Sequence, residues 1–297
     1  MHGHMFDLTA KISANPRLAF QWSYDMPGMP TVNAMASIRG ADLNMMNWGS
    51  NSLSFNYLQA KQEAFLSNIK LKHTDVKGGL RNEIIIVRNV KSSQFIGDYD
   101  FSQLSNDFIS FFADAESYTF DDGYFPTQGI DTGISYSWVF AGFPRRIHNF
   151  HVIKADGKFV FPINEKLTFL PSFDFRFLFG RDIPVAYFNA IGGSVSGRYV
   201  EQQTPFIGVN HLSSMENFLT VYRADFRYTL ARNHYLTGIL NYARDSQYLR
   251  DYFRGHGYFG IGAEYSFDTI LGPLTANIHW SNLTKRFGFY LSAGYNF

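Results

Sequence analysis

The sequence predicts an all-β chain that forms a transmembrane antiparallel β-barrel. Two observations carry this prediction. Apolar and polar residues alternate with a period of two over segments long enough to cross a bilayer as tilted strands, and the apolar parity is dominated by Phe and Tyr. Aromatic residues make up 18% of the 297 residues and charged residues only 17%, whereas charged residues alone reach ~25% of a typical soluble domain. A lipid-facing surface with an aromatic girdle at each interface accounts for this excess.

The clearest alternation lies at the C-terminus, in Phe287–Phe297, where the odd positions are apolar and the even positions are mostly small or polar. Leu274–Ser281 and Gly257–Phe267 repeat the pattern, and Phe218–Leu230 places its charged residues on the second parity. Leu167–Gly180 puts five phenylalanines on one side. A period of two with one apolar face indicates a β-strand, so the polar parity is expected to face the lumen.

Fifteen segments have strand character. They are Phe6–Ser13, Leu18–Tyr24, Thr31–Arg39, Ser52–Gln59, Phe65–His73, Leu80–Asn89, Phe108–Phe120, Ile130–Phe140, Phe150–Pro162, Leu167–Gly180, Phe218–Leu230, Tyr235–Ala243, Gly257–Phe267, Leu274–Ser281 and Phe287–Phe297. Bacterial barrels of one chain have an even number of strands. We therefore predict about 16 strands, the missing one within Ser92–Ser102, with 14 as the fallback.

Short turns such as Asn164-Glu165-Lys166 alternate with longer links such as Gly40–Asn51 and Arg181–Glu216. Short periplasmic turns and longer external loops are the asymmetry expected of an outer-membrane barrel. No repeat or linker divides the chain, so residues 5–297 are interpreted as one barrel domain. Residues 1–4 resemble a cloning remnant and are left out of the fold prediction.

Composition excludes several function classes. The net charge of +1 gives no strong attraction for nucleic acid, and the absence of cysteine removes disulfides, thiolate metal sites and cysteine nucleophiles. The segment Gly193-Ser194-Val195-Ser196-Gly197 superficially suggests a nucleophile elbow, but its central position is Val195. The histidines lack the spacing of a metal site. We therefore expect no catalytic residue, metal or cofactor in this chain.

Three motifs carry a family resemblance. Ile191-Gly192-Gly193-Ser194-Val195-Ser196-Gly197-Arg198-Tyr199 resembles the I-G-G…V-R-G-F/Y stretch in the sixth extracellular loop of the surface-antigen family, which includes outer-membrane assembly factor barrels and two-partner secretion transporters. Its motif positions are Gly192, Gly193, Gly197 and Tyr199. The segment from Tyr124 to Gly129 looks like the family's F-P-T-x-G periplasmic turn, with Phe125, Pro126 and Gly129 at the motif positions. The ending Tyr295-Asn296-Phe297 is similar to the family's C-terminal aromatic signature.

The resemblance implies that Arg181–Glu216 folds into the lumen and that Arg198 pairs there with an acidic residue of a later strand. Parity makes Asp225 the matching acid, while the family's second acid aligns with Asn241. Glu264 also faces inward and could substitute. An arginine fork on a carboxylate would anchor the loop by charge-assisted hydrogen bonds. The alternative is that Arg198 is a solvated residue of an external loop.

A narrower resemblance concerns Gly197–Phe206, which is similar to the barrels attached to patatin-like phospholipases in the Bacteroidetes, relatives of the type V secretion arrangement. It implies a translocator or anchor in a Gram-negative outer membrane, with a lipase domain and a linker domain outside this chain. The implied partners are outer-membrane lipid and the assembly machinery that receives the C-terminal strand, and a homodimer with a second copy is left open. The alternatives are an assembly or insertion barrel for other proteins and a passive solute pore. A lipase within the barrel wall would need a serine–histidine pair that the lipid-facing parity does not supply.

The barrel seam is the last expectation. In a closed barrel Phe6–Ser13 must pair with Phe287–Phe297, because unpaired backbone groups in hydrocarbon cost several kcal/mol each. Gly288 and Gly294 weaken the final strand, so this seam is predicted to be the weakest. A weak seam resembles what assembly-factor relatives use for lateral opening, and it could equally serve as a contact between two barrels.

The first testable prediction follows from the strand pattern. The purified chain should stay folded only in detergent or lipid, and it should migrate differently on gels before and after boiling, because a closed hydrogen-bonded barrel resists detergent unfolding. A monodisperse, detergent-free solution of the folded chain would contradict the membrane prediction.

Overall fold

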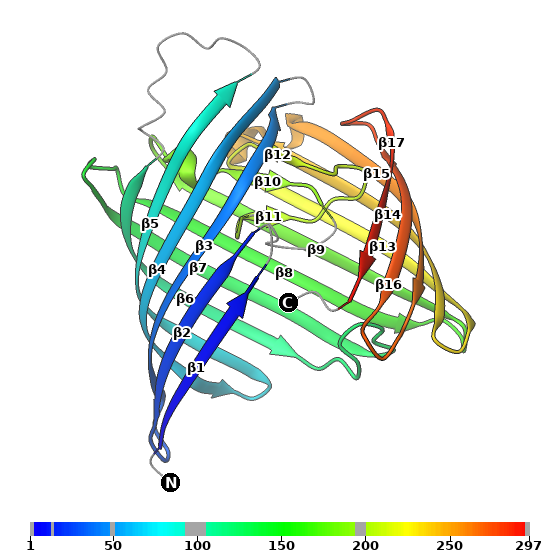
Figure 1. Cartoon of the computed structure of the whole chain (residues 1–297), viewed down its shortest axis with the longest axis horizontal. Coiled ribbons are helices and arrows are strands. Elements are labelled where there is room, and N and C mark those ends of the chain that lie inside the picture. The colour runs from blue at the N-terminus through cyan, green and yellow to red at the C-terminus, as the bar shows by residue number, and fades with distance from the viewer. Residues whose placement is uncertain (1–2, 13–14, 48–50, 93–104, 194–199, 295–297) are drawn as a thin grey trace.

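The computed structural model describes residues 3–12, 15–47, 51–92, 105–193 and 200–294. These residues form a single 17-stranded sheet that curves into a barrel wall (Figure 1). Fourteen of its strands are long and make the wall. In chain order the long strands are β1 (Gly3–Lys11), β2 (Arg17–Asp25), β3 (Thr31–Asn47), β4 (Asn51–Leu71), β5 (Thr74–Ser92), β6 (Asn106–Tyr118), β7 (Gly129–Phe143), β8 (Phe150–Pro162), β9 (Leu167–Gly180), β13 (Phe218–Ala231), β14 (His234–Ser246), β15 (His256–Phe267), β16 (Leu274–Ser281) and β17 (Phe287–Ala293).

The remaining elements are short and belong to loops. Between β9 and β13 lie the 3-10 helix η2 (Val185–Tyr187) and the strands β10 (Asn189–Ile191), β11 (Gln203–Thr204) and β12 (Leu212–Met215). A second 3-10 helix, η3 (Leu249–Arg254), joins β14 to β15. Neither helix in the described part of the chain is long and apolar enough to cross a membrane.

The wall is a continuous antiparallel ladder in which each long strand pairs with its neighbour in sequence. The one long connection spans β9 and β13, which still pair directly, for example Phe177 with Phe218 and Leu167 with Tyr228. The chain therefore leaves the wall after β9, makes the loop, and returns to the next position in the same ladder. This topology places both attachment points of the loop at one end of the barrel, called here the loop end.

The two faces of the wall match the predicted parity. On β15 the residues Phe259, Ile261 and Tyr265 point outward and are exposed, whereas Tyr258 points inward and is buried. On β13 the outward Phe226 stacks on Phe169 of β9 with ring centroids 4.9 Å apart. Apolar side chains thus cover the outside of the wall, as required of a barrel surrounded by lipid. The inside carries polar side chains, together with apolar clusters that pack against the loop.

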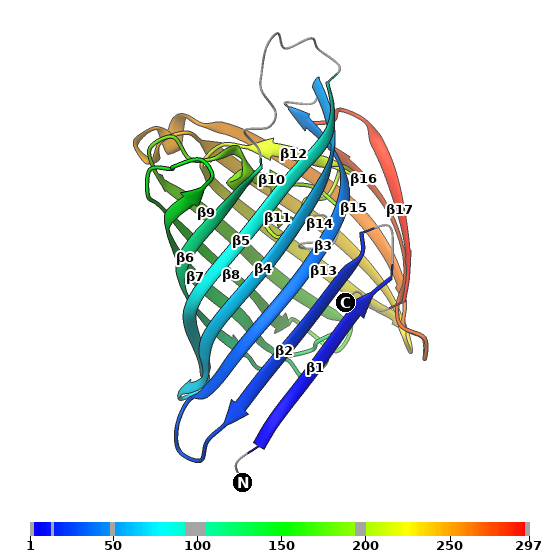
Figure 2. The ribbon, with the colours of Figure 1, turned by 60° about the vertical axis from the view of Figure 1, so that its left-hand side comes forward.

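Strands β3, β4 and β5 are much longer than a bilayer crossing requires. They rise above the rest of the wall at the loop end (Figure 2). This length corrects two sequence predictions. Ser52–Gln59 and Phe65–His73 are halves of the single strand β4, and most of the predicted link Gly40–Asn51 belongs to β3 and β4. In the sequence, the polar residues between the two halves look like a turn. In the structure Lys61 and Glu63 continue the strand, with their side chains facing the polar lumen.

Merging those two segments gives fourteen long strands among the described residues, which is the fallback count. The sixteenth strand had been expected within Ser92–Ser102. Ser92 ends β5, and residues 93–102 lie outside the described residues. Fourteen is an even number, so in this antiparallel ladder β1 begins and β17 ends at the same end of the barrel.

The edges of the sheet are β1 and β17. Within the described residues β1 pairs with β2 and β17 pairs with β16, and no backbone pairing joins β1 to β17 (Figures 1 and 2). The expected direct pairing at the seam is therefore not found in this part of the chain. β17 has only 7 residues, and along β1 all residues but Lys11 are exposed, inward and outward parities alike.

This arrangement leads to a prediction about backbone protection. Amides of β1 and β17 should exchange with solvent roughly tenfold or more faster than those of β13 and β14, because each edge strand has a partner on one side only. Hydrogen exchange read by mass spectrometry in detergent micelles measures this directly. Equal protection of the edge strands and of β13 would show that the seam is paired in solution.

Candidate functional site

The candidate site is the long loop between β9 and β13, which folds back into the lumen. Its short strands form a small ladder, in which β10 pairs in parallel with β11 and antiparallel with β12. β12 in turn pairs in parallel with β3, through Leu212 and Met45. Eight apolar side chains in the described part of the loop are at most 7% exposed, and they are Ala186, Ala190, Ile191, Val200, Phe206, Ile207, Val209 and Leu212. This confirms the prediction that the loop occupies the lumen.

Two glycines of the predicted loop motif make the fold of the loop possible. Gly192 and Gly193 both have positive φ, at +136° and +68°, a region that other residues rarely adopt. A Cβ on Gly192 would lie 1.8 Å from the carbonyl oxygen of His211. Gly193 donates its N–H to the carbonyl of Val209 at 2.6 Å. The motif therefore brings the two halves of the loop into direct backbone contact.

The loop tip rests on the wall formed by β14, β15 and β16. Ile207 lies over two inward glycines of β15, since a Cβ on Gly260 would be 2.3 Å from the Ile207 carbonyl oxygen and one on Gly262 would be 2.9 Å from its side chain. Asn241 of β14 accepts a hydrogen bond from the Ile207 N–H at 3.4 Å. The hydroxyl of Ser281 donates to the carbonyl of Gly208 at 2.9 Å. Small residues of the wall thus create the space that the loop backbone fills.

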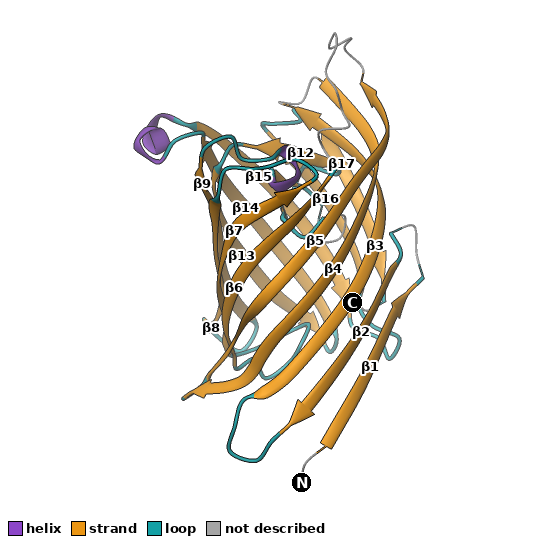
Figure 3. Cartoon of the chain, turned by 90° about the vertical axis from the view of Figure 1, so that its left-hand side faces the viewer, coloured by secondary structure: helices purple, strands orange, loops and turns teal. Residues whose placement is uncertain are grey.

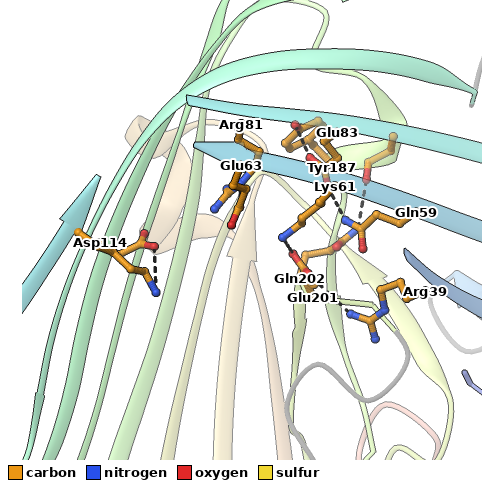
Figure 4. A network of polar contacts seen from close by, with 12 residues as sticks. Arg39, Gln59, Lys61, Glu63, Arg81, Glu83, Asp114, Tyr187, Glu201 and Gln202 are labelled. Carbon is orange, nitrogen blue, oxygen red and sulfur yellow. Dashed lines mark hydrogen bonds and ion pairs between the residues drawn. The ribbon is translucent and has the colours of Figure 1, made fainter. Parts of the chain in front are cut away.

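An ion cluster binds the other side of the loop to β3 and β4 (Figure 4). Glu201 forms an ion pair with Lys61 of β4, and a second with Arg39 of β3 at 4.0 Å. Both cations are largely buried, with side chains 12% or less exposed, while the Glu201 side chain is 38% exposed towards a lumenal cavity of about 130 Å³. Burial raises the pKa of Glu201, but the charges of Lys61 and Arg39 outweigh this and lower its pKa below the ordinary value of 4.5.

Helix η2 is held on the same side of the lumen. The Tyr187 hydroxyl donates to Glu83 of β5 at 2.7 Å, and Gln59 of β4 donates to the same carboxylate (Figure 4). The Tyr187 ring packs edge-on against Phe108 and Phe150, with centroids 5.1 and 4.8 Å away. The buried Glu83 carboxylate thus has two hydrogen-bond donors, as buried polar groups require. Both the hydroxyl and the ring of Tyr187 therefore fix η2 to the wall.

The base of the loop is tied to β9. Arg176 donates to the Tyr187 carbonyl at 3.0 Å and to the Asn189 side chain. Asn189 donates in turn to the carbonyls of Glu216 and Asn217, at 2.7 and 3.0 Å. These contacts clamp the outgoing and returning ends of the loop together, so the loop leaves and rejoins the wall at one point.

The predicted periplasmic turn enters the lumen from the opposite end. Pro126 accepts a hydrogen bond from Arg227 at 2.5 Å, and Phe125 stacks on Tyr235 at 4.2 Å. Asp121 caps the turn by accepting from the Thr127 hydroxyl and from the N–H groups of Thr127 and Gln128. The Thr127 hydroxyl first, and then these N–H groups, lower the pKa of Asp121 to about 2.

The turn and the loop tip meet at one cavity of about 180 Å³. Phe125 from the turn, Ile207 from the loop, and Arg223 and Glu264 from the wall all line it. The lumen is therefore filled from both ends. Among the described residues that line this cavity, the charged ones are Arg223 and Glu264, on strands that follow the loop.

The predicted anchor residues have mixed outcomes. Asn241 contacts the loop through Ile207, and Glu264 lies at the cavity, where it accepts from Ser266 and Asn277 at 3.3 and 3.2 Å. Asp225 accepts two hydrogen bonds from Arg223 at 2.8 and 3.0 Å. The partner predicted for Asp225, Arg198, lies outside the described residues, as do Gly197, Tyr199, Tyr295 and Phe297. The pairing of Arg198 with Asp225 stays a prediction.

Sequence reasoning missed the cations and carboxylates that bind the loop. Glu201 stands inside the motif Gly197–Phe206, and Lys61, Glu83 and Arg176 all lie on the inward parity of their strands. Parity alone marks them as lumenal, but nothing in one sequence shows which inward charges meet across the barrel.

The described residues hold no group of three or more histidine or acidic side chains placed to bind a metal ion. The His151 and His234 rings hydrogen-bond to the hydroxyls of Tyr136 and Tyr265, and His279 bonds to Asn277. The geometry of the lumen is that of a packed plug held by ion pairs and hydrogen bonds.

The contact between Ile207 and β15 gives a testable prediction. Replacing Gly260 with Val should force the loop off the wall, since overpacking a tight contact costs about 1–3 kcal/mol, and trypsin should then cut within residues 181–217 roughly ten times faster. The matched control is Gly238→Val on β14, where an added Cβ has nothing within 4 Å. Equal cleavage rates for the two folded variants would contradict the contact.

The ion cluster predicts a dependence on pH. Because the pKa of Glu201 is lowered in the folded protein, its contribution is complete above the ordinary value of 4.5 and is lost as the pH falls through the lowered pKa. Acidification should therefore loosen the loop, and Glu201→Gln should be looser at pH 7 and change less with pH. Protease sensitivity across the pH range measures this, with Glu165→Gln in an exposed turn as the control. A Glu201→Gln profile identical to wild type would exclude the ion cluster as the cause.

Comparison with known proteins identifies the family of this barrel. A family model described as the OMP85 superfamily matches residues 30–297. No curated protein sequence matches the chain.

Solved structures share the fold. BamA from Haemophilus ducreyi lacking POTRA domains 1–3 superposes with a TM-score of 0.68 at 12% identity, over 98% of this chain and 63% of that one. CdiB from Escherichia coli gives 0.55 at 13% identity, over 94% and 51% of the two chains. CdiB from Acinetobacter baumannii gives 0.51 at 12% identity, over 89% and 46%. The chain thus spans less than two thirds of the length of these proteins. It belongs to the OMP85 superfamily and is a bacterial outer-membrane β-barrel.

Proposed function

We propose that this barrel is the membrane-embedded translocator and anchor of a larger outer-membrane protein, and that it carries no catalysis itself. The observation that supports this proposal most directly is the lumen occupied from both ends. Glu201 binds the loop to β3 and β4, Asn241 and Ser281 bind its tip to the opposite wall, and Arg227 binds the periplasmic turn. Apolar packing between the loop and the wall also holds this plug. A plug held only by non-covalent contacts suits a conduit that opens when a passenger displaces it.

Membership in the superfamily and the narrower motif resemblance support a more specific proposal. The loop residues Gly197–Phe206 resemble the barrels of patatin-like phospholipases, so we infer a type V secretion-like parent protein whose lipase lies outside this chain. The gene sequence upstream of residue 5 tests this inference. A patatin-like reading frame in continuity with the barrel is expected, and a different domain in that position would exclude it.

A second candidate function is the insertion of other barrel proteins into the membrane. The observation that favours it is the pair of edge strands, since within the described residues β1 and β17 each lack a partner on one side. A free strand edge is a template for adding another strand. The same edges would also suit a contact with a second copy of this barrel, or recognition of β17 by the assembly machinery.

The alternative function is a passive solute pore. Electrical recording distinguishes such a pore from a plugged translocator. In planar bilayers the wild-type barrel should show closed intervals with brief openings, because the loop blocks the lumen. A variant in which residues 186–214 are replaced by a short Gly-Ser linker should conduct steadily. Replacing the exposed turn 164–166 in the same way is the control and should leave the recordings unchanged.

The outcomes discriminate between the functions. Steady wild-type conductance equal to that of the loop-deleted variant would support the passive pore and contradict the plugged translocator. A loop-deleted barrel that remains closed would show that another segment blocks the lumen.

A further inference from the structure

Helix η3 stands outside the barrel wall at the loop end, and nothing in the translocator proposal uses it (Figure 3). It is the connection between β14 and β15, and it turns away from the lumen, whereas η2 lies inside the barrel. The segment from Tyr248 to Arg254 contains three aromatic residues, one leucine, two arginines and one aspartate. The position of this helix against the wall decides what it can contact.

Two contacts fix η3 to the outward face. Tyr252 shares a hydrogen bond with the hydroxyl of Thr220 on β13, and Arg244 of β14 donates to the Phe253 carbonyl at 3.2 Å. The Arg244 guanidinium also lies 6.0 Å from the centre of the Tyr252 ring. Thr220 has the same parity as the outward Tyr222, so η3 lies against the surface that faces lipid and not above the lumen.

The neighbouring aromatic residues give the height of η3 in the membrane. Phe218, one outward position above Thr220, packs against Phe177 and Phe179 of β9 with ring centroids 5.6 and 5.0 Å apart. These outward rings at the ends of their strands form part of the girdle expected at the membrane–water interface. Helix η3 lies beside these rings, at the height where a membrane–water interface is expected.

The exposed side chains of η3 and the residue before it are of two kinds. Tyr248 and Leu249 are each 54% exposed and Phe253 is 84% exposed. The Arg250 side chain is 81% exposed, lies 5.2 Å above the Tyr248 ring, and contacts Asp251, the only acidic residue of the helix, at 3.4 Å. Arg254 is exposed as well. The segment thus combines large apolar groups with a net positive charge.

We propose that η3 is a lipid-binding element that docks on the outer leaflet, with Leu249 and Phe253 inserted at the acyl boundary and Arg250 and Arg254 bound to headgroup phosphates. Interfacial helices of this composition bind through buried apolar area together with attraction to anionic lipid. Guanidinium groups match phosphate oxygens with paired hydrogen bonds. The surface is continuous with the lipid-facing wall, which is why lipid is the occupant that fits it. The proposal depends on the membrane location of the barrel and not on its transport activity.

Insertion is tested by a fluorescent probe, because the chain has no cysteine and a single introduced one can be labelled specifically. Phe253→Cys is labelled with an environment-sensitive dye and the barrel is placed in nanodiscs of equimolar phosphatidylcholine and phosphatidylglycerol. The dye should be quenched by lipids that carry a quencher near the headgroup. Gly123→Cys, in an exposed turn with open space around it, is the water-exposed reference. Quenching at position 253 no stronger than at position 123 would overturn insertion.

Phosphate binding is tested in the same nanodiscs with spin-labelled phosphatidylglycerol and phosphatidylcholine. The variant Arg250→Gln/Arg254→Gln should lower the preference for phosphatidylglycerol about fivefold or more. The control Lys166→Gln/Arg232→Gln removes the same charge from turns at the opposite end and should have little effect. An equal loss in both variants, or no loss in either, would overturn a specific site on η3. Gel mobility before and after boiling confirms that each variant is folded.

Discussion

Backbone hydrogen bonding in hydrocarbon is the constraint on which the rest of this structure depends. Each unsatisfied N–H or C=O in lipid costs several kcal/mol, so the strands must form one continuous ladder. That ladder sends alternate side chains to opposite faces, which makes the outside apolar and leaves the inside to polar residues. The polar inside then supplies the groups that hold the loop, among them Lys61, Arg176 and Asn241.

The loop is attached to its two walls by different physical means. On β3 and β4 the attachment is electrostatic, because a buried cation without a partner would cost several kcal/mol and Glu201 provides the partner. On β15 the attachment is steric, because Gly260 and Gly262 leave room for the backbone at Ile207. The two attachments respond to different perturbations. Acid weakens the first, and added bulk weakens the second.

The sequence predicted the faces of the wall well, because alternation is a local property of each strand. Parity placed Arg223, Asp225 and Glu264 in the lumen, where Arg223 and Glu264 line a cavity and Asp225 pairs with Arg223. The prediction was wrong for β4, which is one strand and not two. Lys61 and Glu63 interrupt the apolar pattern because they face the polar lumen, and the interruption was interpreted as a break between two strands. The contacts of Glu201 with Lys61 and of Tyr187 with Glu83 could not be predicted, since each joins residues far apart in sequence.

The same reasoning explains the seam. Whether the first and last strands of a barrel pair with each other depends on the curvature of the whole wall, which no local pattern encodes. In the described residues the edges are β1 and β17, two of the shortest wall strands. In the sequence, the aromatic residues of η3 look like part of an ordinary loop. Only the contacts with Thr220 and Arg244 show that this helix packs against the outside of the wall.

An engineered disulfide tests whether the loop lies inside the lumen with its tip on β15. The chain has no cysteine, so Ile207→Cys/Gly262→Cys introduces a single pair at the observed contact, while Ile207→Cys/Gly238→Cys places the second thiol on the outward face of β14. Mild oxidation of the folded barrel in detergent should cross-link the first pair nearly completely and leave the second as free thiols. Failure of the first pair to form, or equal formation of both, would contradict a loop docked in the lumen.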